Sequence, residues 1–222
     1  MLTEKAPTPV KRRSKGERTK LLIVESAIKI LAEHGIKGTT HRAIASHANI
    51  QLSFTTYYFK DIQELVQQAF ALNSHNTTKT IEPLWQPILS IVNAKTKLAL
   101  RKVSIRVELR EQLTDLLLKL ILENTKKNRP QLIVEQQLFT EIQLSPSLRF
   151  IVEQLDDAQL APCLQLCQYF SKDMANVNAQ LLLTLVRQIQ YRQLLAESST
   201  VNIANIRSLL NQTLAIVLAL KP

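Results

Sequence analysis

The chain has 222 residues, of which 45% are hydrophobic and 21% charged, as is typical of soluble globular proteins. Its formal net charge of +10 lies mostly in residues 1–60, where 11 Lys and Arg face 4 Asp and Glu, and this excess favours a polyanionic partner such as DNA or an anionic membrane surface. Only three glycines occur, none beyond Gly38, which excludes Gly-rich phosphate-binding loops and nucleophile elbows and argues against nucleotide-binding and hydrolase folds.

Neither a membrane segment nor a cofactor site is indicated. No apolar run approaches the ~18 residues needed to span a bilayer, and the basic N-terminus lacks the apolar core of a signal peptide. We therefore expect a cytoplasmic protein. Cys163 and Cys167, spaced i, i+4 in an apolar stretch, favour free buried thiols over a disulfide. The four histidines lack metal-ligand spacing, so we expect no metal, no cofactor and no catalytic residue.

The first segment, residues 1–17, contains two prolines and a basic run, and we expect a flexible arm. Three of its basic residues either enter a minor groove or, as we favour, only raise non-specific affinity for DNA: Lys11, Arg12 and Arg13. From about Arg18, apolar residues recur at helical spacing, and Gly35 provides a C-terminal stop.

Two short helices follow. Thr39 or Thr40 is suited to cap a helix at about 40–47, and Asn49 and Ile50 form a turn before another helix at about 51–58. Short helices joined in this way are typical of a helix-turn-helix, although such hairpins also occur as packing units.

The remainder of the chain has helical periodicity throughout, so the expected fold class is all-α. Prolines delimit the candidate helices, and Pro162 is expected to kink or split its segment. The candidate helices span about 61–80, 84–93, 96–125, 130–143, 146–171, 174–196 and 202–220.

Four of the chain's eleven aromatic residues cluster at 54–59. On a helical wheel, at about 100° per residue, three side chains face the preceding helices: Leu52, Thr55 and Phe59. A second face is polar and basic: Ser53, Thr56, Tyr57 and Lys60. Phe54 and Tyr58 lie together on a third side. The polar face has the groups that grip phosphates and read base edges, whereas the alternative is a three-helix core that uses all four aromatic rings.

This region resembles the DNA-binding region of the TetR family of bacterial transcriptional regulators over about residues 18–66. The matching positions are TT at 39–40, IA at 44–45, Ala48, Ile50, TTYYF at 55–59, Asp61 and Leu65. Asn49 replaces the family's usual Gly and tolerates a left-handed backbone. Changes at Ser53, Phe54 and Thr56 imply that this chain reads a different base sequence from better-matching relatives.

The resemblance implies a homodimer that places its 51–58 helices in the major grooves of a roughly palindromic DNA operator, with half-sites about 34–36 Å apart. Ser53, Thr56 and Tyr57 are then assigned to base edges or the groove. Gln51 either reaches a base edge or is only an exposed first-turn residue. The expected phosphate contacts are Thr40, Arg42, Tyr58 and Lys60.

The resemblance also implies three parts: the arm, a three-helix DNA-binding domain at 18–64, and a larger helical ligand-binding and dimerisation domain at 65–222. The last two helices, about 174–196 and 202–220, are expected to form the homodimer, unless they only close the monomer core. Helices within 96–171 would surround the pocket for an unidentified small-molecule effector. The candidate pocket residues are Trp85, Glu108, Glu111, Phe139, Glu141, Phe150 and Tyr169, and nothing in the sequence selects among them.

The leading hypothesis is therefore a ligand-responsive transcriptional regulator, most often a repressor in this family. One alternative is a helical interaction protein whose basic N-terminus docks on a membrane or polyanion, but residues 1–20 lack the apolar face that membrane docking needs. Another is an all-helical enzyme built on a carboxylate pair, Glu108 with Glu111 or Asp156 with Asp157.

Overall fold

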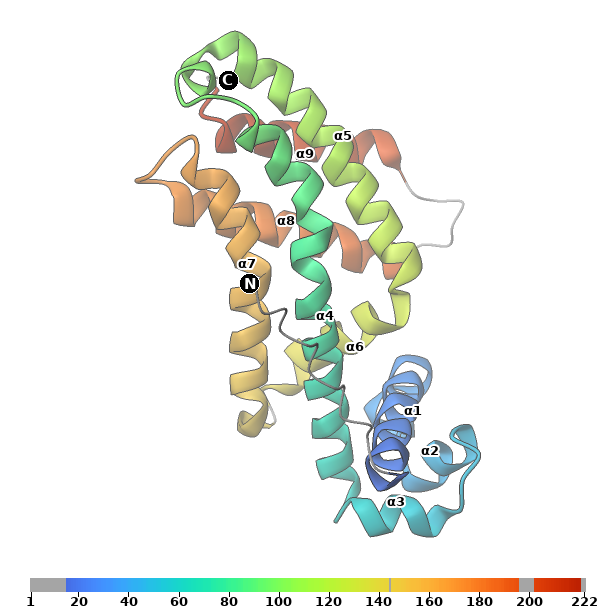
Figure 1. The fold of residues 1–222 in the computed structure, drawn as a ribbon. Coiled ribbons are helices and arrows are strands. Elements are labelled where there is room, and N and C mark those ends of the chain that lie inside the picture. Colours follow the sequence, from blue (N-terminus) through green and yellow to red (C-terminus); the bar gives the residue numbers. More distant parts are fainter. Residues whose placement is uncertain (1–14, 144, 196–201, 221–222) are drawn as a thin grey trace, which may run out of the picture.

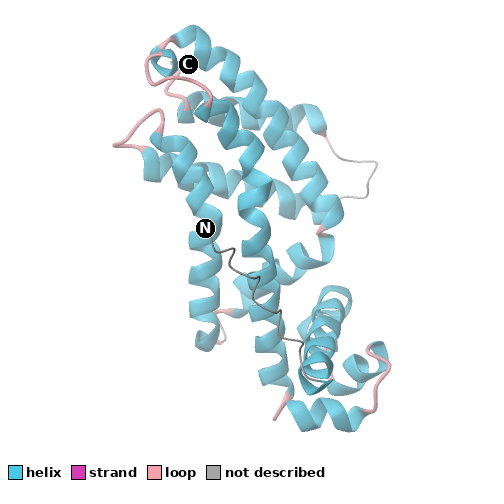
Figure 2. Ribbon diagram, in the orientation of Figure 1, coloured by secondary structure: helices cyan, strands magenta, loops and turns pink. Residues whose placement is uncertain are grey.

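The computed structural model describes residues 15–143, 145–195 and 202–220, and this part of the chain is helical and contains no strand (Figure 2). The all-α expectation is confirmed. The longer helices are α1 (Lys15–Gly38), α2 (His41–His47), α3 (Leu52–Tyr58), α4 (Ile62–Asn93), α5 (Val103–Lys127), α6 (Arg129–Glu141), α7 (Arg149–Gln168), α8 (Ala175–Leu195) and α9 (Ile203–Val217). Two single turns of 3₁₀ helix precede α5 and α7: Ala99–Arg101 and Pro146–Leu148. Most of the predicted arm, with Lys11, Arg12 and Arg13, lies outside the described residues.

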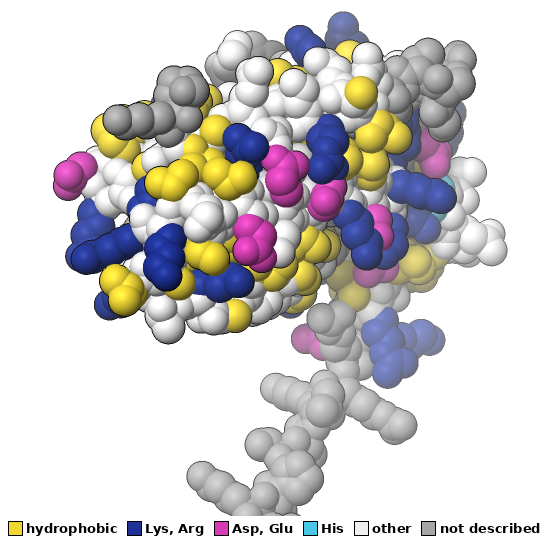
Figure 3. Space-filling view, turned by 90° about the horizontal axis from the view of Figure 1, so that it is seen from above, with side chains coloured by type: hydrophobic (Ala, Val, Ile, Leu, Met, Phe, Trp, Pro, Cys, Tyr) yellow, Lys and Arg dark blue, Asp and Glu magenta, His cyan; other side chains and the backbone are white. Residues whose placement is uncertain are grey.

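The molecule is elongated, with α1, α2 and α3 at one end and α5, α8 and α9 towards the other (Figure 1). Helix α4 runs from the end of α3 along the length of the molecule, with α7 packed beside it. The end farthest from α3 displays a mixture of apolar, basic and acidic side chains (Figure 3).

Two apolar clusters hold these helices together. The first joins α1 and α2 to Phe59, to the first half of α4, and to the inner faces of α6 and α7. The second joins the second half of α4 to α5, α7, α8 and α9. Because α4, α6 and α7 contribute to the first cluster beside α1, the small N-terminal unit packs directly on the rest of the chain.

The structure corrects four expectations about the later helices. Residues 61–80 and 84–93 form one helix, α4, with Pro83 and Pro87 inside it. Both prolines are exposed, whereas neighbouring Trp85 and Ile88 are buried, so apolar burial holds the helix together despite two missing N–H donors. Pro162 likewise lies inside a continuous α7, packed in the buried interior, and does not split it.

The other two corrections are smaller. The expected helix at 96–125 begins as a 3₁₀ turn, and α5 starts only at Val103, after an extended Lys102. The expected helix at 146–171 begins with the 3₁₀ turn at Pro146–Leu148, and α7 ends at Gln168. None of the described helices is long and apolar enough to cross a bilayer.

Candidate nucleic-acid interface

The turns between α1, α2 and α3 are fixed by local hydrogen bonds and by two unusual backbone conformations. Gly35 has φ 66° and ψ −177°, which interrupts α1 as its glycine predicts. Thr39 then donates its Oγ1 hydrogen to the Gly35 carbonyl at 2.8 Å, while Thr40 caps α2 by accepting from the Ala43 N–H at 3.1 Å. Asn49 adopts the left-handed region, φ 52°, in the turn before α3, which confirms the expectation for this residue.

The inner face of α3 is narrower than the wheel predicts. Phe59 is 1% exposed, and the centre of its ring lies 5.5 Å from Lys20 Nζ on α1. Thr55 is fully buried, and its Oγ1 donates a hydrogen bond to the Leu52 carbonyl at 2.8 Å. Leu52, however, is 44% exposed, so its predicted core role is wrong. Thr55 and Phe59 already fill the space beneath α3, and Leu52 stands at its first position, beyond them.

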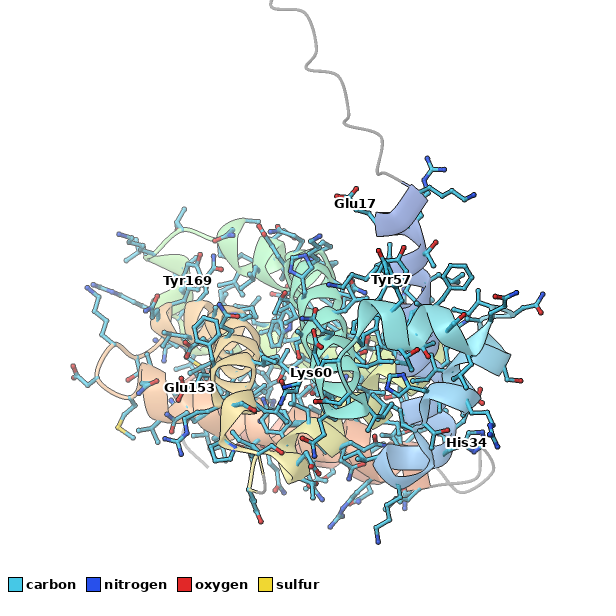
Figure 4. The ribbon with its side chains drawn as sticks, turned by 90° about the horizontal axis from the view of Figure 1, so that it is seen from below. Glu17, His34, Tyr57, Lys60, Glu153 and Tyr169 are labelled. Carbon is cyan, nitrogen blue, oxygen red and sulfur yellow. The ribbon has the colours of Figure 1, made fainter. Side chains whose placement is uncertain are left out.

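The outer face of α3 presents the predicted polar groups to solvent. Five predicted contact residues are exposed on or beside α3 and α2: Thr40, Arg42, Gln51, Ser53 and Thr56. Tyr57 is 79% exposed, and Lys60 follows α3 on the same end of the molecule (Figure 4). Thr56 Oγ1 donates to the Ser53 carbonyl at 3.2 Å, which leaves its oxygen free to accept.

Tyr58 is half-buried and contacts both Tyr57 on α3 and the first turn of α1. Its ring meets that of Tyr57 edge-to-face, with centroids 5.1 Å apart and planes at 86°. Its hydroxyl lies 3.2 Å from where a Cβ on Gly16 would stand, so it reaches the first turn of α1. The aromatic cluster is therefore divided between core and surface, and Phe54 is exposed rather than packed inside.

The contact of Tyr58 with α1 brings in basic residues that sequence reasoning did not assign to this surface. Lys15 and Arg18 are exposed on the first turns of α1, beside the end of α3. The only sequence signal was the positive charge of residues 1–60. A second missed feature is the capping box of α4: Glu64 accepts from the Lys60 N–H at 2.9 Å and donates its own N–H to Asp61 Oδ1 at 2.8 Å. This box fixes the backbone direction at Lys60.

A cavity of about 220 Å³ lies between α4, α5, α6, α7 and α8. Its apolar wall consists of Ile81, Leu84, Trp85, Leu120, Leu132, Leu183 and Val186. Of the candidate pocket residues, Trp85 lines this cavity, whereas Phe150 is exposed and Glu141 does not reach it. Helices α4 and α8 contribute more of the lining residues than the 96–171 region from which the pocket was expected.

A buried polar network borders the cavity. Glu135 Oε1 accepts from Gln159 Nε2 at 3.0 Å and from Tyr191 Oη at 2.9 Å. Arg187 donates to Asp156 at 2.8 Å and to Gln159, and its guanidinium lies 4.5 Å from the centre of the Phe139 ring. Burial is the main cause that raises the pKa of Glu135, against the hydrogen bonds that it accepts.

Glu108, Glu111 and Asp156, three of the carboxylates considered for an enzyme, have structural partners. Glu111 accepts from Asn211, which is the main cause that lowers its pKa, and it also pairs with Arg110 and Arg207. Glu108 accepts from Gln112 at 3.0 Å. Cys163 and Cys167 are free and buried, as expected, and burial raises the pKa of Cys167 to about 12.

Helices α8 and α9 carry apolar side chains on their outer surfaces as well as in the core. The exposed ones are Val177, Leu181, Leu195, Ile203, Leu209 and Ile216. Their inner positions, such as Leu182 and Leu210, are buried in the second apolar cluster. The last two helices therefore close the monomer core and still leave apolar surface outside.

Comparison with known proteins supports the resemblance of the helix-turn-helix to a family of regulators. Residues 23–69 match the model for bacterial regulatory proteins of the tetR family. The probable HTH-type transcriptional regulator YttP of Bacillus subtilis (strain 168) is 29% identical over 174 residues, which cover 69% of this chain and 81% of that protein.

Solved structures share the fold. A transcriptional regulator from Rhodococcus sp. Rha1 has a TM-score of 0.59 at 14% identity, covering 93% of this chain and 97% of that one. The multidrug binding protein EbrR, complexed with proflavin, has a TM-score of 0.51 at 20% identity, covering 88% of this chain and 99% of that one. The resemblance to bacterial regulatory proteins of the tetR family is thus confirmed over the helix-turn-helix at residues 23–69, and the solved structures share the helical fold of the whole chain.

Proposed function

We propose that this TetR-family transcriptional regulator is a cytoplasmic, ligand-responsive repressor that binds a palindromic DNA operator as a homodimer. The observation that carries the proposal is the outer face of α3, where hydroxyl and amide groups stand exposed while Thr55 and Phe59 anchor the helix from below. A short helix held rigidly and exposing such groups suits insertion into a major groove.

The proposed contacts follow from position. Gln51, Ser53, Thr56 and Tyr57 read base edges from α3. The residues proposed to hold phosphates are Thr40, Arg42, Tyr58 and Lys60, to which we add Lys15 and Arg18 on α1. The proposed domains are the DNA-binding domain at 18–64, which α1 extends back to Lys15 into the expected arm of 1–17, and the effector and dimerisation domain at 65–222.

Dimerisation is proposed through α8 and α9. The exposed Leu181 and Ile216, with their neighbours, supply apolar surface that a second copy would bury. A two-fold axis along this surface makes the two α3 helices equivalent, and hence makes the operator palindromic.

Release by an effector is supported by the position of α6. One side of this helix lines the cavity through Gln131, Leu132 and Glu135. The other packs on α1, where Gln137 Nε2 donates to the Leu31 carbonyl at 3.0 Å and Leu138 joins the first apolar cluster. An effector that binds one position of α6 more tightly would shift α1, and with it the separation of the two α3 helices. EbrR, a multidrug binding protein that shares the fold, supports a small molecule as the effector.

The test is fluorescence anisotropy of the full chain on labelled DNA from immediately upstream of its own coding region, against scrambled DNA, with a salt titration. We expect nanomolar, sequence-selective binding that weakens as salt rises. Equal, weak binding to both DNAs, followed by no selective fragment in a genome-wide screen, would reject the regulator proposal.

A further inference from the structure

We propose that the effector is a small organic monocation with N–H donors, held by the carboxylate of Glu135 in the cavity beside α6. This inference rests on the proposed function, which requires an effector, and it assigns the effector a chemical class. It starts from polar atoms on the cavity wall that have no partner.

Glu135 is 2% exposed and lines the cavity. Its Oε1 accepts two hydrogen bonds, from Gln159 and Tyr191, but its Oε2 is buried without a partner. Gln131 Oε1, one turn earlier on α6, also lines the cavity and is also buried without a partner. Two unpaired acceptors on one wall favour a ligand that donates hydrogen bonds.

The charges beside Glu135 favour a positive ligand. Arg187 faces Glu135 from α8, but it is already paired with Asp156 of α7 and lies over the Phe139 ring. In the form where Glu135 is ionised, the two carboxylates of Glu135 and Asp156 face one guanidinium, and this leaves a formal deficit of one positive charge. Arg187 Nε is an unpaired donor, yet an anion placed there would lie in the same cavity as Glu135.

The rest of the wall is suited to a ring. Trp85, Ile81 and Leu84 come from α4, opposite Leu132 of α6 and Val186 of α8. The volume of about 220 Å³ suits a molecule with one ring rather than a large dye. A planar cation with an apolar ring can pack against the apolar wall and donate hydrogen bonds to the unpaired acceptors of Glu135 and Gln131.

Protonation gives a second signature. Burial raises the pKa of Glu135 above its ordinary value, so the neutral carboxyl persists to higher pH in the empty site than it does in a carboxyl exposed to water. A bound cation favours the ionised form and so releases a proton, and its affinity should fall as pH falls. The groups that face this carboxyl are Gln159 and Asp156 on α7, and Arg187 and Tyr191 on α8.

Isothermal titration calorimetry of the full chain without DNA provides the test, with three probes of one shape: benzamidinium, neutral benzamide and anionic benzoate. We expect benzamidinium to bind at least about tenfold more tightly than benzamide, since a hydrogen bond to a charged group is worth more than a neutral one. Benzoate should not bind. Titrations in two buffers of different ionisation enthalpy, repeated over a series of falling pH values, should show proton release on benzamidinium binding that grows as pH falls.

Glu135→Gln keeps the size of the side chain and removes its charge. This variant should bring benzamidinium and benzamide within about threefold of each other and abolish proton release. Glu141→Gln, on the same helix but outside the cavity, should behave like the parent chain. Equal binding of the cation and the neutral probe by the parent chain, a preference for benzoate, or no binding of any probe at 10 mM would overturn the inference.

The operator assay separates this inference from the proposed function. Selective operator binding without a cation preference would leave the regulator proposal standing and reject the cation site. A Glu135-dependent cation preference without selective DNA binding would support the site and reject the regulator proposal.

Discussion

Tyr57 and Phe59 stand two residues apart at the end of α3, and replacing each by Ala should separate DNA recognition from folding. Phe59 is 1% exposed, so Phe59→Ala removes a buried ring from the cluster shared by α1, α3 and α4. Such truncations cost about 3–5 kcal/mol. Tyr57 is 79% exposed, and its described ring contact is the edge-to-face one with Tyr58. Tyr57→Ala should therefore change the free energy of unfolding by no more than about 0.5 kcal/mol.

The effects on DNA binding should differ in kind. Loss of a groove contact at Tyr57 should weaken operator binding by about 1–3 kcal/mol, or roughly 5- to 150-fold, and leave binding to scrambled DNA unchanged. Urea unfolding followed by far-UV circular dichroism measures the first quantity, and anisotropy on both DNAs measures the second. If Tyr57→Ala unfolds the chain as readily as Phe59→Ala, the ring belongs to the core and our assignment of α3's outer face is refuted.

Three further substitutions test other parts of the interpretation. Lys60→Ala should weaken binding to operator and scrambled DNA alike and reduce the slope of log affinity against log salt by about 0.9 per phosphate contact, measured by salt titration. Gly35→Ala should lower the free energy of unfolding, measured by urea titration, by about 1–3 kcal/mol, because a backbone with φ 66° and ψ −177° is essentially restricted to Gly. A steric clash does not contribute, since no atom lies within 4 Å of the new Cβ. Leu181→Glu, on the outer surface of α8, should give monomers in sedimentation velocity, whereas the control Val103→Glu, exposed on α5, should not; dimers in both would place the interface elsewhere.

The helix-turn-helix could be predicted from sequence because its determinants are local. Thr40, Asn49 and Phe59 each act through their own backbone or a neighbouring helix, and each does in the structure what its residue type predicts. The prediction for Leu52 was wrong because a helical wheel gives the face on which a side chain lies but not whether another helix covers that face. Along α3, the buried core begins only at Thr55. The prediction that Pro83 and Pro87 separate two helices was wrong for a similar reason. A rule based on neighbouring residues does not include the packing of Trp85 and Ile88 in the core, which holds α4 together.

The cavity could not be predicted, because its residues come from helices far apart in the chain. Glu135, Gln159 and Arg187 meet only through the packing of α6, α7 and α8. In the sequence, Glu135 is one of several carboxylates with no motif around it. Glu108 and Glu111, three residues apart, looked more like a site, but both are exposed and have partners that stabilise α5 and α9.

The polar groups of α3 and those of the cavity differ in what water can do for them. The exposed hydroxyls of α3 exchange hydrogen bonds to water for hydrogen bonds to DNA at little cost in free energy. They therefore do not favour one conformation of the protein over another. Glu135 Oε2, Gln131 Oε1 and Arg187 Nε are buried without partners, and each such group destabilises the fold by about 1–3 kcal/mol. A ligand with N–H donors that pairs with the two acceptors, Glu135 Oε2 and Gln131 Oε1, stabilises the arrangement of α6 that buries them. It gains less from any arrangement that exposes these acceptors to water. Release from DNA requires that the ligand bind two conformations with different affinity, and that difference can arise at these two atoms.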